Sequence, residues 1–184
     1  MQTDHELMTA VAQGDLDSMS PLYERRHRAL CRLFYRLTSR QTLSEDLTHE
    51  VFLRMMRYRE TYNTVGAEFD SWMYRIARNT LTDHARKNRR ETGIEPDEQT
   101  ADTKDLNPFE SMAKRQETAM LYRALRQLPE DKRELLVLTR FQGLSHEQIG
   151  KVLGCEAGTV KGRVFRAMKE IGRIYEDLLR EKAS

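Results

Sequence analysis

Residues 145–171 constrain the fold more than any other stretch, because they have the pattern of two helices joined by a short glycine-containing turn. The apolar residues of the second helix recur at the spacing of one helical face, and they are Val160, Val164, Ala167 and Ile171. Lysines, arginines and Phe165 lie off that face. Such a helix suits the major groove of DNA, where arginine bonds guanine edges and apolar groups touch thymine methyls. The alternative is an amphipathic helix with a solvated basic face.

Helical periodicity continues along most of the chain, and runs rich in β-branched residues are nearly absent. Only nine glycines and four prolines interrupt 184 residues, so we predict an all-α protein. With 39% hydrophobic and 33% charged residues, the chain suits small helical units with much surface.

Charge divides the chain into two basic blocks around an acidic strip. Residues 91–113 hold seven acidic residues and one lysine, whereas 1–90 and 114–184 each hold 15 basic residues, against 12 and 10 acidic ones. The strip also contains two prolines and few apolar residues, which is typical of a flexible linker. We therefore predict a domain over 1–93, a linker over 94–113 and a second domain over 114–184.

A helix predicted from a Ser44 cap to about Tyr58 has two faces. Its core stripe consists of Leu47, Val51, Met55 and Tyr58. On the opposite face Leu53 is framed by polar and charged residues, namely Asp46, His49, Glu50 and Arg57. An apolar residue framed by charges is typical of a protein contact. The alternative is a solvated face with one stray leucine.

The next predicted helix, capped by Asp70 or Ser71 and reaching about Arg90, carries a mixed row of side chains. The row consists of Trp72, Arg75, Asn79 and Arg86. Aromatic, amide and guanidinium groups in one row can stack on and hydrogen-bond an unpaired base, although the tryptophan can instead pack inside. Basic residues at the helix end can neutralise phosphates or complement the helix dipole, and they are Arg86, Lys87, Arg89 and Arg90.

Catalytic and metal-binding patterns find no support in the sequence. The pairs His49-Glu50 and His146-Glu147 each lack the second histidine, four positions on, that a zinc HExxH site needs. No glycine-rich phosphate loop or nucleophile elbow occurs. We expect no enzymatic activity, no bound metal and no cofactor.

Cysteine usage and hydropathy point to a cytoplasmic protein without membrane insertion. Cys31 and Cys155 lie far apart and form no disulfide framework, and neither has neighbours that mark a redox sensor. The first ten residues are acidic and lack the apolar core of a signal peptide. No apolar run approaches the roughly 20 residues needed to span a bilayer.

Four blocks together resemble bacterial sigma factors of the extracytoplasmic-function group. They are SEDLTHEVFLR (44–54), FDSWMYRIARNTLTDHARKNRR (69–90), LPEDKRELLVLTRFQGLSHEQIGKVLG (128–154) and GTVKGRVFRA (158–167). The resemblance covers nearly the whole chain, in the family's order and spacing, and includes the position of the linker.

The resemblance implies two small helical domains that bind core RNA polymerase and promoter DNA. The polymerase-binding positions carried over are Asp46, His49, Glu50, Leu53 and Arg57. Recognition and opening of the −10 element would use Trp72, Arg75, Asn79, Arg86, Lys87 and Arg89, with the loop 63–69 helping to hold a flipped base. The −35 element would be read by Thr159, Lys161, Gly162, Arg163, Phe165 and Arg166.

Three residues depart from the family's usual pattern. His49 stands where glutamine is common, and its charge varies near neutral pH. Gly162 stands where serine is common, which removes a side chain from the DNA face and costs about 0.5–1 kcal/mol of helix stability relative to alanine. Glu156 replaces a serine cap and leaves the start of the recognition helix open.

Two further expectations concern partners. The resemblance implies an anti-sigma factor that covers the 44–60 face and the basic face of 158–173. The alternative function is a stand-alone helix-turn-helix regulator, which would have no need of the blocks in the N-terminal half.

Overall fold

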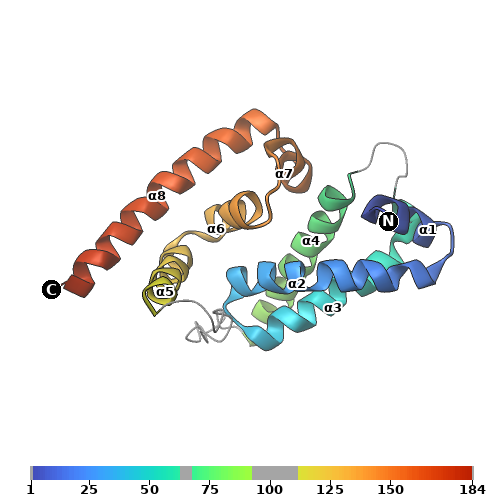
Figure 1. Ribbon diagram of the computed structural model, residues 1–184, viewed down its shortest axis with the longest axis horizontal. Coiled ribbons are helices and arrows are strands. Elements are labelled where there is room, and N and C mark those ends of the chain that lie inside the picture. Colours follow the sequence, from blue (N-terminus) through green and yellow to red (C-terminus); the bar gives the residue numbers. More distant parts are fainter. Residues whose placement is uncertain (1, 63–67, 93–111, 184) are drawn as a thin grey trace.

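The computed structural model describes residues 2–62, 68–92 and 112–183, and these form helices without any strand (Figure 1). The N-terminal half consists of α1 (Asp4–Ala12), η1 (Leu16–Ser18), α2 (Met19–Thr38), α3 (Gln41–Arg57), η2 (Arg59–Thr61) and α4 (Phe69–Thr92). The C-terminal half consists of α5 (Met112–Gln127), α6 (Glu130–Leu136), η4 (Val137–Phe141), α7 (His146–Leu153) and α8 (Ala157–Ala183). The all-α prediction is confirmed.

The predicted acidic linker lies almost wholly outside the described residues, because α4 ends at Thr92 and α5 begins at Met112. Within the described part of the chain, no helix combines the length and apolar character needed to cross a membrane.

Helices α2 and α3 form the centre of the N-terminal half and run side by side (Figure 1). Leu30 and Phe34 of α2 and Val51 and Met55 of α3 are fully buried between the helices. The turn between them is short because Ser39 adopts the left-handed conformation, with φ 56°, and ends α2. Burial of large apolar side chains stabilises such a pair by about 1.5–3 kcal/mol for each residue.

Two expected helix boundaries were wrong. Helix α3 begins at Gln41, and Ser44 lies inside it, fully buried, with its Oγ donating to the Arg40 carbonyl at 2.7 Å. A serine that bonds the carbonyl four residues back tolerates a helix interior. Helix α4 begins at Phe69, and the Ser71 Oγ donates to Glu68 Oε2 at 3.1 Å rather than capping the helix itself.

The C-terminal half packs α5 and α6 against the long helix α8, which runs along one side of the molecule (Figure 1). This smaller core contains Leu125, Leu128, Leu136, Ala167 and Ile171. Pro129 precedes α6, where its missing amide costs no hydrogen bond, and Gly143, with φ 69°, follows the π-helical turn η4.

The larger hydrophobic core crosses from one half of the protein to the other. It joins residues of α1 to α4 with Leu138, Leu144 and Ile149 of the C-terminal half. Helix α7 packs against both α4 and α8, so the two halves form one continuous packed unit.

Candidate protein and nucleic-acid interfaces

The helix-turn-helix predicted from residues 145–171 is present. Ser145 and Gln148 form a reciprocal capping box at the start of α7, which satisfies two backbone donors. Gly154 ends α7 in the left-handed conformation, with φ 68°, where glycine carries no steric cost. Helix α8 then begins at Ala157, directly after Glu156, whose carbonyl accepts from the Val160 amide at 3.1 Å.

The first half of α8 separates buried and exposed residues as its periodicity predicts. The buried stripe contains Val160, Val164, Ala167 and Ile171. The exposed residues include Thr159, Lys161, Arg163, Phe165 and Arg166, and Phe165 leaves 72% of its surface exposed. The exposed ring and the cations around it are therefore available for contact with a partner.

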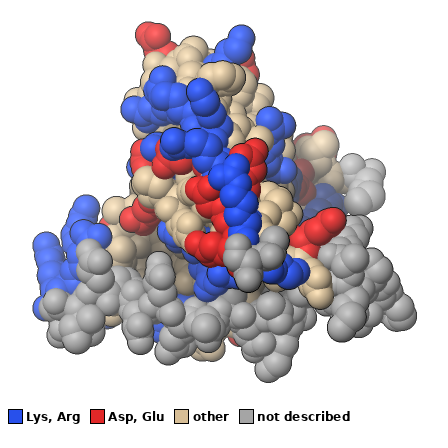
Figure 2. Space-filling view, turned by 90° about the vertical axis from the view of Figure 1, so that its left-hand side faces the viewer, with Lys and Arg blue, Asp and Glu red and all other residues tan. Residues whose placement is uncertain are grey.

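Gly162 leaves room on this face. A Cβ built there meets only Nη1 of Arg166, at 3.8 Å, which is ordinary contact with the end of a flexible side chain. Figure 2 shows lysine and arginine side chains gathered over the upper part of the molecule, where the first half of α8 lies, with acidic side chains both among them and lower down.

The exposed row on α4 consists of fewer residues than the sequence suggested. Arg75 and Asn79 are exposed and lie one helical turn apart. Trp72 is only 7% exposed and packs edge-on against Tyr62, with ring centroids 5.1 Å apart. The expectation that the indole belongs to an exposed row was therefore wrong, and the inward alternative holds because the aromatic core beneath α4 takes up the ring.

The basic end of α4 is exposed. Arg86, Lys87 and Arg89 all face solvent, and the Arg86 Nη1 lies 3.9 Å from Asp83. Of the predicted base-holding loop 63–69, residues 63–67 lie outside the described residues, and Phe69 is buried in the core.

The face predicted on α3 is present and surrounds an exposed leucine. Leu53 leaves 58% of its surface exposed, and Asp46, His49 and Arg57 are also exposed. Glu50 accepts from the Arg54 Nε at 2.7 Å, and the same guanidinium donates to Asp83 of α4 at 2.7 Å. These bonds fix the α3 face relative to α4. Tyr58, expected in the core stripe, instead caps the helix end and is exposed.

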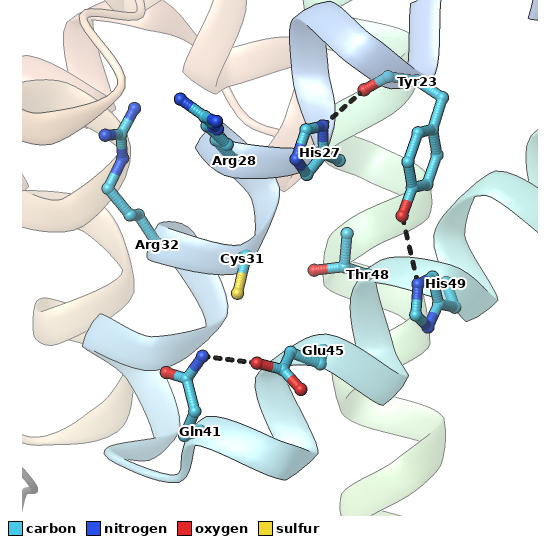
Figure 3. Close-up of a pocket in the computed structure, with 9 residues that line it drawn as sticks. All are labelled: Tyr23, His27, Arg28, Cys31, Arg32, Gln41, Glu45, Thr48 and His49. Atoms are coloured by element: carbon cyan, nitrogen blue, oxygen red, sulfur yellow. Dashed lines mark hydrogen bonds between the residues drawn. The ribbon is translucent and has the colours of Figure 1, made fainter. Parts of the chain in front are cut away.

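Sequence reasoning missed the aromatic stack beside this face. The Tyr23 ring lies parallel to His27 and His49, with centroids 4.9 and 6.2 Å away, and its hydroxyl lies 3.1 Å from His49 Nε2 (Figure 3). The three rings border a pocket of about 290 Å³ between α2 and α3. The spacing of Tyr23 and His27 showed a shared helical face, but nothing in the sequence indicated that His49 would join it.

A half-buried network of charged side chains holds the start of α4. Asp70 pairs with Arg26 at 3.1 Å, and Arg26 also hydrogen-bonds Asp4 of α1. Burial raises the pKa of Asp70 above its usual value, an effect that the Arg26 charge opposes. Burial likewise raises the pKa of Tyr62 to about 12. Among the described residues, no group of three or more histidine, cysteine or acidic side chains could hold a metal ion.

Comparison with known proteins identifies both halves. Residues 22–91 match the family model for sigma-70 region 2, and residues 118–171 match the model for sigma-70 region 4. The chain is 32% identical to the RNA polymerase sigma-H factor of Pseudomonas aeruginosa, covering 98% of this chain and 97% of that protein. It is 30% identical to the ECF RNA polymerase sigma-E factor of Haemophilus influenzae, covering 96% and 97%.

Solved structures share the fold. CnrH in complex with the cytosolic domain of CnrY aligns with a TM-score of 0.71 at 23% identity, over 95% of this chain and 97% of that one. RpoE of Bartonella quintana in complex with the anti-sigma factor NepR aligns with a TM-score of 0.73 at 24% identity, over 85% and 96%.

Proposed function

The chain belongs to the extracytoplasmic-function group of the sigma-70 family and is an alternative sigma factor, and from that premise we propose how its surfaces divide the work of promoter-specific initiation. Residues 1–93 bind core polymerase and act on the −10 element, residues 94–113 connect, and residues 114–184 read the −35 element. The protein acts by binding, and the polymerase supplies the chemistry.

The polymerase-binding surface is the α3 face around Leu53, and the exposure of this leucine is the observation that carries the proposal. A leucine that is 58% exposed and ringed by charged groups has the composition of an interface centre with a polar rim. Its rigid backing by α2 and α4 means that little conformational entropy is lost on binding. His49, held against Tyr23 at 3.1 Å, takes the place of the family's usual glutamine as a hydrogen-bonding group.

The −10 surface is the exposed side of α4. Asn79 supplies an amide that can bond an unpaired base edge, and Arg75 adds a guanidinium that can stack or bind phosphate. Trp72 does not touch DNA; its packing against Tyr62 holds α4 in position. Arg86, Lys87 and Arg89 extend the surface with phosphate contacts.

The −35 surface is the exposed side of α8 in the major groove. Arg163 and Arg166 supply bidentate donors, and Phe165 offers apolar contact to a thymine methyl. Gly162 places no side chain among them, so the −35 preference differs from that of a relative with serine at this position.

An anti-sigma factor is the regulatory partner that fits these surfaces. A protein that covers Leu53 and Phe165 together would hide the two most exposed apolar side chains of the described residues. It would thereby block polymerase and DNA at once.

Titration of the full chain onto core polymerase that lacks sigma tests the assignment. We expect saturable binding that is lost in Leu53→Asp and kept in the matched control Leu179→Asp, since Leu179 is similarly exposed, at 46%, but lies near the end of α8. Equal binding by both variants would reject the α3 face. No binding by the folded native chain would instead favour the stand-alone regulator.

A further inference from the structure

Helix α1 contributes to none of the proposed binding surfaces, yet it packs beside the start of α4, which carries the −10 surface (Figure 1). A capping box formed by Thr3 and Glu6 fixes its first turn. Its apolar face is buried in the core through Leu7, Met8 and Val11, which are at most 2% exposed. The polar residues Asp4 and His5 of the first turn are therefore held in fixed positions against the rest of the N-terminal half.

A first chain of contacts runs from Asp4 to the first turn of α4. The Asp4 carboxylate is only 13% exposed and accepts from the Arg25 Nη1 at 3.0 Å and from the Arg26 Nε. The other side of the Arg26 guanidinium reaches α4, where its Nη2 lies 3.1 Å from Asp70 Oδ1 and its central carbon 5.5 Å from the centre of the Phe69 ring. A planar, forked guanidinium can offer separate nitrogens to two carboxylates, which a lysine ammonium cannot.

A second chain of contacts runs from the neighbouring residue, His5. Its Nδ1 lies 2.7 Å from the hydroxyl of Tyr62, which directly follows η2. Burial raises the pKa of Tyr62 to about 12, so the hydroxyl keeps its proton at physiological pH and can donate to the imidazole. The Tyr62 ring packs edge-on against Trp72, with centroids 5.1 Å apart, and against Phe69, with centroids 6.4 Å apart. Such aromatic pairs add to stability beyond the area that they bury.

The two chains begin at adjacent residues of α1 and end within one turn of α4, at Asp70 and Trp72. Arg75 and Asn79, the exposed residues of the −10 surface, lie on the following turns of the same helix. A rigid helix passes any tilt of its first turn on to the side chains further along. Extruding a base from a duplex is unfavourable, so the surface that receives the base is most effective when it is already in place.

We propose that α1 is a positioning element for the −10 surface, with Arg26 and Tyr62 as the positioning residues that transmit its hold to α4. The inference rests on the proposed function of α4. Neither residue needs to touch DNA, because Tyr62 is only 3% exposed and Arg26 is occupied by two carboxylates. They keep Arg75 and Asn79 oriented, so that little order has to be gained when an unpaired strand binds.

Binding of the holoenzyme to an unpaired −10 strand measures this effect separately from polymerase binding. The probe is a fluorescent single-stranded oligonucleotide selected from a randomised pool by the native holoenzyme, and anisotropy gives its affinity. Arg26→Lys keeps the charge but cannot hold both carboxylates, and Tyr62→Phe removes only the hydroxyl that faces His5. The loss is bounded by the worth of the broken contact, so we expect each variant to bind about threefold to tenfold more weakly. Affinity for core polymerase should stay unchanged, because Arg54 and Asp83 hold the α3 face separately.

Matched controls make the same chemical changes elsewhere. Arg28→Lys alters an exposed arginine two residues further along α2, and Tyr175→Phe removes a hydroxyl from α8 in the C-terminal half. Both should bind the oligonucleotide as the native chain does. Val11→Ala opens a cavity at the far end of α1 and lowers the melting temperature. It should nevertheless keep native affinity below its unfolding range, which separates loss of stability from loss of position.

Variants in α1 itself test whether the hold originates there. Asp4→Asn combined with His5→Leu leaves Arg26 and Tyr62 in place but frees both from α1, so affinity should fall at least as far as in Tyr62→Phe. His5→Leu alone should also weaken binding. His5→Asn should restore it, because an amide can again meet the Tyr62 hydroxyl.

The outcomes separate this inference from the proposed function. Native affinity in Arg26→Lys or Tyr62→Phe, or no recovery in His5→Asn, overturns the positioning role and leaves the −10 assignment intact. An equal loss in Val11→Ala, or a parallel loss of affinity for core polymerase, also overturns it, because an effect on the whole fold would then explain the result. Native affinity in Asn79→Ala would instead overturn the proposed function of α4 and this inference with it.

Discussion

Gly150 lies in α7 where the turn before α8 passes back over the helix. An alanine Cβ at this position would stand 2.5 Å from the Cys155 carbonyl oxygen and 3.6 Å from the Ala157 nitrogen. The close atoms belong to the backbone, so no flexible side chain can move aside. The turn itself must retreat by about 0.9 Å or more to restore ordinary contact.

The expected cost follows from these contacts. Overpacking of a tight site costs about 1–3 kcal/mol. The same shift stretches the hydrogen bond from the Cys155 amide to the Gly150 carbonyl, now 3.0 Å, which is worth about 0.5–1.5 kcal/mol. The higher helix propensity of alanine offsets about 1 kcal/mol of this destabilisation. We therefore expect Gly150→Ala to destabilise the protein by about 1–3 kcal/mol.

Gly172→Ala is the matched control. Gly172 lies inside α8, and its added Cβ would meet no atom within 4 Å. The same chemical change should therefore stabilise the protein by about 0.5–1 kcal/mol. Urea unfolding measures both, as a shift of midpoint at unchanged slope. In a chain of this size, Gly150→Ala should lower the melting temperature by roughly 2–4 °C for each kcal/mol.

Equal stability of the two variants would refute the reasoning, because only the close approach of the turn distinguishes them. A second readout concerns the −35 surface. The turn sets the angle between α7 and α8, so Gly150→Ala should also weaken −35 binding by the holoenzyme, whereas Gly172→Ala should leave it unchanged.

Two further predictions follow from exposure and burial. Arg75→Ala and Asn79→Ala should abolish promoter opening, and Arg163→Ala and Arg166→Ala should weaken −35 binding. The melting temperature of each variant should stay unchanged, because all four side chains are exposed. Full transcription from a cognate promoter would contradict the assignments. Asp70 has a folded-state pKa raised by burial, so its contribution to stability is present below about pH 4 and is lost as pH rises through the folded pKa. Asp70→Asn should flatten the pH profile of urea midpoints just above pH 4, and an unaltered slope there would contradict the burial effect.

The helix-turn-helix could be predicted closely because its determinants are local. The capping pair Ser145 and Gln148 and the terminating Gly154 each act within one or two turns of chain. The stripe beginning at Val160 needs only a regular helix to be read correctly. Such local signals predict the helix boundaries and the buried face correctly, because they do not depend on contacts with the rest of the protein.

Predictions failed where two faces of a helix compete for the same residue. Trp72 was placed beside Arg75 because a tryptophan can contact DNA or pack in a core, and the choice depends on Tyr62, which lies ten residues earlier in the sequence. Ser44 looked like a cap because it precedes two acids, but the Arg40 carbonyl offered its hydroxyl a partner inside the helix. In both cases a tertiary or local hydrogen-bonding partner overrode the sequence signal.

The arrangement of the two halves was beyond the sequence for a related reason. Apolar periodicity in α7 predicts that Ile149 and Val152 are buried, but it does not name the surface that buries them. From the sequence alone, Arg78 and Glu134 are expected to face solvent, because they lie 56 positions apart and nothing indicates that they pair. Exposed ion pairs such as Glu68 with Lys151 contribute only about 0–1 kcal/mol each, so the apolar residues beneath them hold the two halves together, and no charge pattern in the sequence marks that contact.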